Sequence, residues 1–143
     1  MKRMPLFVVL VLPVIASAQA KTDQEAVRQA AVNYVTAVYE SKPELIEASV
    51  HPQLTKHGFM RQPDGTYKQG LMTYAQLLDV ARNWNKDRKR DTSIKEVQVL
   101  DVLDQTATAK IRASWGIDYM QLAKFDGTWK IINIVWQTPP PKP

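Results

Sequence analysis

The sequence predicts an α+β fold, in which N-terminal helices pack against a curved antiparallel sheet. In the first half of the chain, apolar residues recur at helical spacing behind hydroxyl-bearing N-cap signals. In the second half, apolar and polar residues alternate with a period of two, as they do in half-buried strands. Helices and strands that segregate in this way are typical of an α+β layer architecture. Long twisted strands then curl around a helix.

The composition excludes several classes of site. The 143 residues suffice for one domain with its own core, and the formal net charge is +5. The chain has no cysteine, which rules out disulfides, thiolate zinc sites, iron–sulfur clusters and a cysteine nucleophile. His51 and His57 are the only histidines, so we expect no metal site. Phosphate-loop, dinucleotide and G-x-S-x-G motifs are absent as well, and we expect no cofactor.

Residues 1–20 have the pattern of a secretory signal peptide. A basic start, Met1-Lys2-Arg3-Met4, precedes an apolar run over 6–15 and the small residues Ala16-Ser17-Ala18. The run is shorter than the roughly 20 residues of a transmembrane helix, so we expect no stable membrane insertion; an uncleaved anchor is the alternative. Cleavage after Ala18 or Ala20 would leave a periplasmic or secreted protein.

The mature chain is expected to form one domain over residues 21–137, followed by a proline-rich tail over 138–143. Four of the five residues after Thr138 are prolines, which cannot donate a backbone hydrogen bond to a sheet, so a solvated polyproline extension is predicted.

Three segments match the capping box, with a hydroxyl at the N-cap and Glu or Gln three residues later. They are Thr22-Asp23-Gln24-Glu25, Ser41-Lys42-Pro43-Glu44 and Thr73-Tyr74-Ala75-Gln76. The first predicts a helix of about 18 residues with one apolar stripe, made of Val27, Ala30, Ala31, Tyr34, Val35 and Val38. The second predicts a short helix over 43–49, because the proline of His51-Pro52 pushes the residue before it into extended geometry. The third predicts a helix leading to Trp84.

The remaining elements are strands. Pro63-Asp64-Gly65, between arms carrying Phe59 and Tyr67, predicts a small hairpin. Four strands are expected over 97–103, 106–115, 117–125 and 129–136. The second of these has strict alternation, with Ala107, Ala109, Ile111 and Ala113 on its dry face.

The segment 115–136 follows the pattern W-x-x-D-Y-x-x-L-x-K-x-x-G-x-W-K-I-x-N-x-x-W. This pattern resembles the C-terminal signature of the "Putative lumazine-binding" family, a branch of the nuclear transport factor 2-like (NTF2-like) superfamily. Tyr39-Glu40 and His51-Pro52-x-Leu54-x-Lys56 also look like family positions, but His57 stands where relatives often carry arginine. The resemblance implies a cone-shaped α+β barrel that often forms a homodimer through the outer sheet face. It also implies a superfamily of isomerases, cyclases and dehydratases together with non-catalytic binders.

The candidate catalytic residues are Asp118, His51 and Tyr119. An acid–base enzyme in a cone needs a carboxylate or imidazole facing a dry cavity, with a hydroxyl or acid to stabilise developing charge. Asp118 and Tyr119 are adjacent on a strand, so only one of them can face inward, which weakens an Asp–Tyr pair. Asp118 and His51 could instead have structural roles. Asp118 would then bind a backbone group or a basic neighbour such as Lys124, and His51 would bind a nearby backbone carbonyl.

The candidate ligand-binding residues are those whose rings or flexible side chains could line a pocket mouth. They are Trp84, Trp115, Trp136, Met60, His57 and Tyr119, whereas Trp129 is expected in the core. The basic stretch 82–90 is interrupted by acidic Asp87 and is expected to be a solvated loop that binds no nucleic acid.

The leading hypothesis is an exported, non-catalytic homodimer that binds a small apolar or aromatic ligand. One alternative is a cofactor-free isomerase, cyclase or dehydratase that uses a pocket Asp or His as general base. Another is an assembly module that pairs with a second envelope protein. Whether the tryptophans fill the cone or line it stays open at this point.

Overall fold

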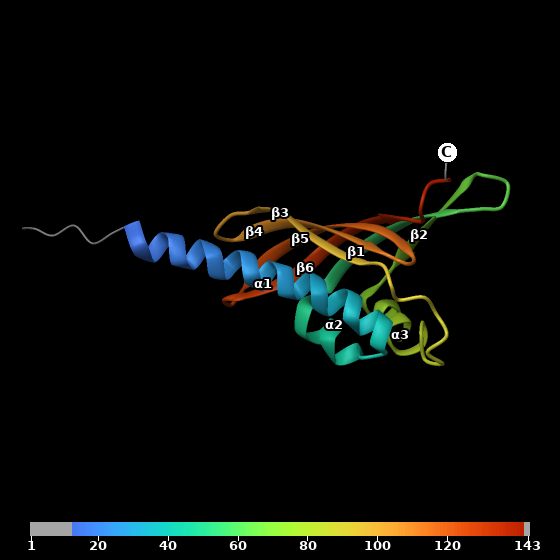
Figure 1. Ribbon diagram of the computed structural model, residues 1–143, viewed down its shortest axis with the longest axis horizontal. Coiled ribbons are helices and arrows are strands. Elements are labelled where there is room, and N and C mark those ends of the chain that lie inside the picture. Colours follow the sequence, from blue (N-terminus) through green and yellow to red (C-terminus); the bar gives the residue numbers. More distant parts are fainter. Residues whose placement is uncertain (1–12, 142–143) are drawn as a thin grey trace, which may run out of the picture.

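The computed structural model describes residues 13–141, with side chains from residue 22 onward. Three helices cover one face of a single curved sheet (Figure 1). The basic start and most of the apolar run of the predicted signal peptide, and the last two residues of the tail, lie outside the described residues. The helices are α1 (Pro13–Glu40), α2 (Pro43–Ser49) and α3 (Tyr74–Asn83), and the strands are β1 (Val50–Arg61), β2 (Tyr67–Met72), β3 (Lys95–Val102), β4 (Thr106–Ala113), β5 (Gly116–Phe125) and β6 (Thr128–Gln137).

Helix α1 begins earlier than the capping box predicts. Thr22 therefore lies inside the helix and is not its N-cap. Proline is tolerated in the first helical turn, and no glycine or proline interrupts the sequence from residue 14 to Glu40. The helix consequently continues through the alanine-rich segment that precedes Thr22.

Helix α2 has the predicted bounds, but its predicted capping box does not form. Its N-cap is Lys42, without a side-chain hydrogen bond. Ser41 instead ends α1 in the left-handed conformation, with φ 53°, and the amide of Lys42 donates to the carbonyl of Ala37 at 2.9 Å. Ser41 therefore caps the C-terminal end of α1 and cannot also be the N-cap of α2.

Helix α3 begins at the predicted capping box. The hydroxyl of Thr73 accepts from the amide of Gln76 at 3.2 Å, and the amide of Thr73 donates to the Gln76 side chain at 2.8 Å. This box is confirmed in both of its hydrogen bonds.

The six strands form one open sheet in the order β2-β1-β6-β5-β4-β3. All neighbours are antiparallel except β1 and β6, which are parallel and are separated in the chain by four intervening strands. The predicted hairpin is present and longer than expected, since β1 follows α2 directly. The sheet curves around α1 without closing (Figure 1).

The core lies between α1 and the inner face of the sheet. The four predicted dry-face residues of β4 are all buried, and so is Trp129, which is 4% exposed. On α1, the predicted apolar stripe is buried against them; it comprises Val27, Ala30, Ala31, Tyr34, Val35 and Val38. The alternation therefore assigned the correct face of β4 to the core.

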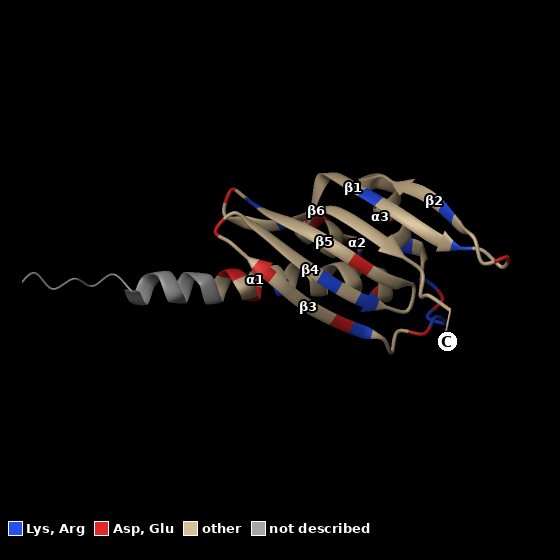
Figure 2. Cartoon of the chain, turned by 90° about the horizontal axis from the view of Figure 1, so that it is seen from above, with Lys and Arg blue, Asp and Glu red and all other residues tan. Residues whose placement is uncertain are grey.

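The outer face of the sheet carries no helix. Figure 2 looks down on this face, and its central strands show few charged residues. Leu71, Tyr119 and Val135 are exposed there, at 72%, 52% and 42% of their surface. None of the helices in the described part of the chain is long and apolar enough to cross a membrane.

Thr138, the first residue after β6, is still hydrogen-bonded to β1. The amide of Thr138 donates to the carbonyl of Phe59 at 3.1 Å, and its hydroxyl accepts from the amide of Arg61 at 2.9 Å. The three prolines that follow, 139–141, are exposed.

Candidate functional site

A buried charged cluster lies on the inner face of the sheet. Lys56 comes from β1, Asp118 from the start of β5 and Tyr34 from α1. Lys56 is 5% exposed and Asp118 is fully buried. Buried charges of this kind are uncommon unless they are paired or functional.

The cluster is held by one ion pair and two hydrogen bonds. The ammonium nitrogen of Lys56 is 3.7 Å from Oδ1 of Asp118 and donates to the hydroxyl of Tyr34. The indole N–H of Trp115 donates to Oδ2 of Asp118 at 2.9 Å. Oδ1 of Asp118 has no hydrogen-bond partner among the described residues. The site thus combines a desolvated ion pair with one carboxylate oxygen that is not bonded.

Burial dominates the electrostatics of the cluster. It lowers the pKa of Lys56 below its ordinary value, and the negative charge of Asp118 opposes part of that effect. Burial also raises the pKa of Tyr34 well above its ordinary value, and the charge of Asp118 raises it further. Tyr34 is therefore a neutral hydroxyl at physiological pH.

Three aromatic rings, those of Trp115, Tyr39 and Trp84, pack together on one side of the cluster. Trp115 packs edge-on against Tyr34, Tyr39 and Trp84, with centroid separations of 6.2, 5.3 and 5.5 Å. Tyr39 and Trp84 stack at 5.7 Å. Trp115 and Trp84 remain half-buried, so this group reaches from the buried carboxylate to the surface.

Trp136 covers Lys56 from the other side. The ammonium of Lys56 lies 5.4 Å from the centre of this ring, which is half-buried. The ring rests directly on Gly58, where a Cβ atom would lie only 2.3 Å from the indole nitrogen. Gly58 pairs with Gly70 across β1 and β2. Two positions beside Lys56 therefore carry no side chain, and the Trp136 ring fills the space at one of them.

The structure separates the predicted acid–base candidates. Asp118 faces the interior and Tyr119 the outer face, as their adjacency on a strand requires. The basic neighbour of Asp118 is Lys56 rather than Lys124, which instead binds Asp23 at 2.8 Å. His51 lies outside the cluster: it stacks on Phe125 at 4.2 Å, and its Nδ1 accepts from the amide of Gln53 at 3.1 Å.

The predicted ligand-binding residues fall into two groups. Trp84, Trp115 and Trp136 belong to the cluster or its aromatic surround. Met60 is half-buried and contacts the inner side of the hairpin near Gly70. His57 and Tyr119 lie on the exposed outer face, on the other side of the sheet from Lys56.

Sequence reasoning missed two members of the cluster, Lys56 and Tyr34. Lys56 is in phase with buried Leu54 and Gly58 on β1, and that phase is the signal that could have found it. Tyr34 was assigned only to the apolar stripe of α1. Its hydroxyl, which faces the ammonium of Lys56, gives it a polar role as well.

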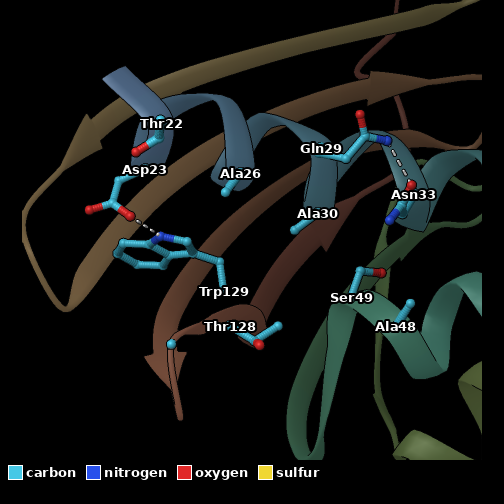
Figure 3. A pocket seen from close by; sticks show the side chains of 11 residues that line it. Thr22, Asp23, Ala26, Gln29, Ala30, Asn33, Ala48, Ser49, Thr128 and Trp129 are labelled. Atoms are coloured by element: carbon cyan, nitrogen blue, oxygen red, sulfur yellow. Dashed lines mark hydrogen bonds between the residues drawn. The ribbon is translucent and has the colours of Figure 1, made fainter. Parts of the chain in front are cut away.

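A separate hollow of about 400 Å³ lies between α1, the end of α2 and the start of β6 (Figure 3). Asp23 forms one wall, where Oδ1 accepts from the indole of Trp129 at 3.0 Å. Oδ1 of Asn33 accepts from Gln29 at 2.8 Å, and the hydroxyl of Ser49 donates to the carbonyl of Leu45 at 2.5 Å. These side-chain groups already have partners within the fold, so the inner-face cluster is the stronger candidate site.

No metal cluster accompanies either site: nowhere in the described part of the chain do three or more His, Asp or Glu side chains gather as ligands. The titratable side chains at the inner-face cluster are those of Lys56, Asp118 and Tyr34. This set can donate, accept and hold a proton in a dry environment.

Comparison with known proteins places these features in a family. The family described as "Putative lumazine-binding" matches residues 22–137. No curated protein matches the chain in sequence.

Solved structures share the fold at low sequence identity. An NTF2-like protein of unknown function from Shewanella baltica OS155 is 17% identical with a TM-score of 0.63, over 85% of this chain and 97% of that one. One from Silicibacter pomeroyi DSS-3 is 13% identical with a TM-score of 0.60, over 90% and 100%. An NTF2-like protein with a cystatin-like fold from Novosphingobium aromaticivorans is 11% identical with a TM-score of 0.61, over 90% and 89%. The predicted fold class is thereby confirmed, with the sheet open rather than closed into a barrel.

Proposed function

We propose, since the chain belongs to the "Putative lumazine-binding" family of NTF2-like proteins, that it is an exported, non-catalytic protein that binds a small, flat aromatic or apolar ligand at the inner-face cluster. The observation that carries this proposal is the pair of half-buried rings, Trp115 and Trp136, on either side of the buried Lys56–Asp118 pair. Binding sites for small molecules combine aromatic walls with a few placed polar groups.

Calorimetric titration with a flat aromatic probe tests the proposal. We expect quinolin-2-one to bind the mature protein saturably and to change its tryptophan fluorescence. The variant Trp136→Ala should weaken binding at least tenfold, because it removes the ring that covers Lys56. The matched control Tyr119→Phe alters only the outer face and should leave affinity unchanged. Failure of flat aromatic probes to bind would contradict the proposal.

Asp118 favours a second candidate function, a cofactor-free isomerase or dehydratase in which it is the general base. Its unbonded oxygen in a dry site supports this alternative. The ammonium of Lys56, 3.7 Å away, argues against it, because it already pairs with the carboxylate that would have to take up the substrate's proton. Turnover of a β,γ-unsaturated ketone that is lost in Asp118→Asn would establish the enzyme.

The outer face of the sheet supports a homodimer. Leu71, Tyr119 and Val135 expose apolar surface without a covering helix, and a second copy of the chain could bury it. Light scattering should give twice the chain mass. Val135→Glu should give the monomer, whereas Leu103→Glu, at an exposed position in the turn after β3, should leave the dimer intact.

Export rests on the pattern of residues 1–20. Expression of the full chain in a Gram-negative host should yield a periplasmic protein whose intact mass lacks residues 1–18 or 1–20. Thr22 would then lie close to the new N-terminus, where its hydroxyl could cap α1. Recovery of the uncleaved chain from the membrane fraction would contradict this part of the proposal.

A further inference from the structure

We infer that the loop between α3 and β3 forms a second binding site, which takes a phosphate monoester group in a basic hollow beside Trp84. The site lies apart from the Lys56–Asp118 pair and does not depend on the ligand proposed there. Figure 1 shows the loop at the end of the molecule opposite to the start of α1. Three features lead to the inference: a loop that is fixed in place, an arginine stacked on a ring and a surplus of positive charge.

The basic hollow lies just beyond the last turn of α3 and has a volume of about 600 Å³. Three of its lining side chains are cationic and one is acidic, so the lining carries a formal charge of +2. The lining residues are Asn83, Trp84, Lys86, Asp87, Lys89 and Arg90. A concave surface with one sign of charge attracts ions of the opposite sign.

The loop that forms the basic hollow is fixed to the end of α1. Asn85 is 3% exposed; its side-chain amide donates to the carbonyl of Tyr39 at 2.8 Å, and its side-chain oxygen accepts from the amide of Arg90 at 3.0 Å. Arg88 has a left-handed φ of 59°, and its guanidinium donates to the carbonyls of Tyr39 and Glu40 at 3.2 and 2.7 Å. These contacts hold the backbone that carries the cations, so the site needs little ordering when an anion binds.

Arg90 has the geometry to bind an oxyanion. Its guanidinium lies 4.7 Å from the centre of the Trp84 ring. A guanidinium stacked on a ring keeps the N–H donors at its edge free, and two of these donors match two oxygens of a phosphate. Within the described part of the chain, this guanidinium has no acidic partner. Its donors are therefore available to a ligand.

The two lysines add charge to the same hollow. Lys86 forms no ion pair with any described side chain. Lys89 lies 3.8 Å from the carboxylate of Asp87, and both side chains are exposed, so the two charges offset each other only weakly. When this pair is counted as neutral, the charges of Lys86 and Arg90 remain without a counterion.

The charge of the basic hollow favours phosphate over carboxylate. A phosphate monoester carries a charge of about −1.5 to −2 at pH 7 and has three strong acceptor oxygens. It can therefore pair with both remaining cations at once. A carboxylate carries a single charge and would leave one of the two cations unpaired.

Equilibrium dialysis of the purified protein against radiolabelled inorganic phosphate tests the inference, because this ion has the charge and the oxygens of the monoester group. We expect saturable binding of one phosphate per chain at low salt. Arg90→Gln should raise the Kd at least tenfold, because two charge-assisted hydrogen bonds are lost. The matched control is Arg82→Gln: this arginine lies on α3, pairs with Asp79 at 2.9 Å and does not line the hollow, so the Kd should not change.

Lys86→Gln provides a variant without a structural cost. The Lys86 side chain has no hydrogen-bond or ion-pair partner among the described residues, so its replacement should leave thermal unfolding unchanged. It should nevertheless raise the Kd for phosphate by about threefold or more, because one of the two free charges is lost. This comparison stays decisive even where circular dichroism shows that Arg90→Gln does not fold.

Vesicles of phosphatidylcholine, with and without phosphatidic acid, distinguish a lipid headgroup from a soluble phosphate. Binding of free phosphate together with Arg90-dependent binding to phosphatidic acid would identify a membrane source, and binding of free phosphate alone a soluble one. Absence of saturable phosphate binding by the unaltered protein would overturn the inference. So would an equal loss of affinity in Arg82→Gln, because the attraction would then come from the general charge of this surface and not from the basic hollow.

Discussion

Replacing Lys56 with Met removes half of a buried ion pair and should lower the free energy of unfolding by about 4 kcal/mol. At a separation of 3.7 Å, two unit charges attract by about 4.5 kcal/mol at an effective dielectric constant of about 20. Methionine fills a similar volume, so the loss reflects mainly the uncompensated carboxylate of Asp118. Removing one partner of a buried pair typically costs about 3–5 kcal/mol.

The double variant Lys56→Met/Asp118→Asn shows how much of the loss in Lys56→Met comes from the unpaired charge. A neutral Asn keeps an acceptor for the indole of Trp115 but leaves no buried charge. We therefore expect this variant to lose about 2 kcal/mol, or half the loss of Lys56→Met alone. Urea unfolding followed by circular dichroism measures the free energy of unfolding of both variants. The dependence of that free energy on urea concentration should be the same as in the unaltered protein.

The matched control is Lys110→Met. Its ammonium lies 5.6 Å from the ring of Tyr119 on the outer face, and the substitution should cost less than about 1 kcal/mol. The electrostatic reasoning would be refuted by a double variant that loses as much stability as Lys56→Met, because the loss would then reflect packing and not the unpaired charge.

Three further predictions concern stability. Burial raises the pKa of Tyr34, so above pH 10.0 the unfolded chain releases the phenolic proton while the folded chain keeps it. The free energy of unfolding should therefore fall above pH 10.0, and fall more steeply in the unaltered protein than in Tyr34→Phe. Gly58→Ala should displace the Trp136 ring and cost about 1–3 kcal/mol with an altered near-ultraviolet circular dichroism spectrum, whereas Gly70→Ala, whose Cβ would lie 3.6 Å from Met60, should leave the spectrum unchanged. Thr73→Ala should cost about 1 kcal/mol through loss of the α3 cap, whereas Ser41→Ala removes a buried hydroxyl without a partner and should cost nothing measurable in thermal unfolding.

Much of the fold follows from local patterns in the sequence. The strict alternation over β4 fixes both its conformation and its buried face, because a one-residue slip would turn every side chain to the other face. The capping boxes were less reliable. Thr73 caps α3, but Ser41 ends α1 and Thr22 lies within a longer helix. A capping motif shows that a residue is able to cap a helix. Whether the helix begins at that residue depends on the conformation of the residues before it.

The candidate site was only half visible in the sequence. Adjacency on β5 separates Asp118 from Tyr119, and aromatic content drew attention to Trp115 and Trp136. Lys56, however, meets Asp118 only because β6, the neighbour of β5, returns after four intervening strands to pair in parallel with β1. No sequence period encodes that pairing. The ion pair is therefore a property of topology, and it had to be found in three dimensions.

The buried pair also bears on what the fold is for. Well-packed apolar residues of similar volume would give a core that is equally stable or more so, so stability alone does not account for Lys56 and Asp118. An apolar double variant, Lys56→Met/Asp118→Leu, separates stability from binding. We expect it to unfold at no lower urea concentration than Lys56→Met/Asp118→Asn, and to bind quinolin-2-one at least tenfold more weakly than the unaltered protein does. A variant that keeps its fold while losing this affinity would show that the ion pair serves recognition rather than packing.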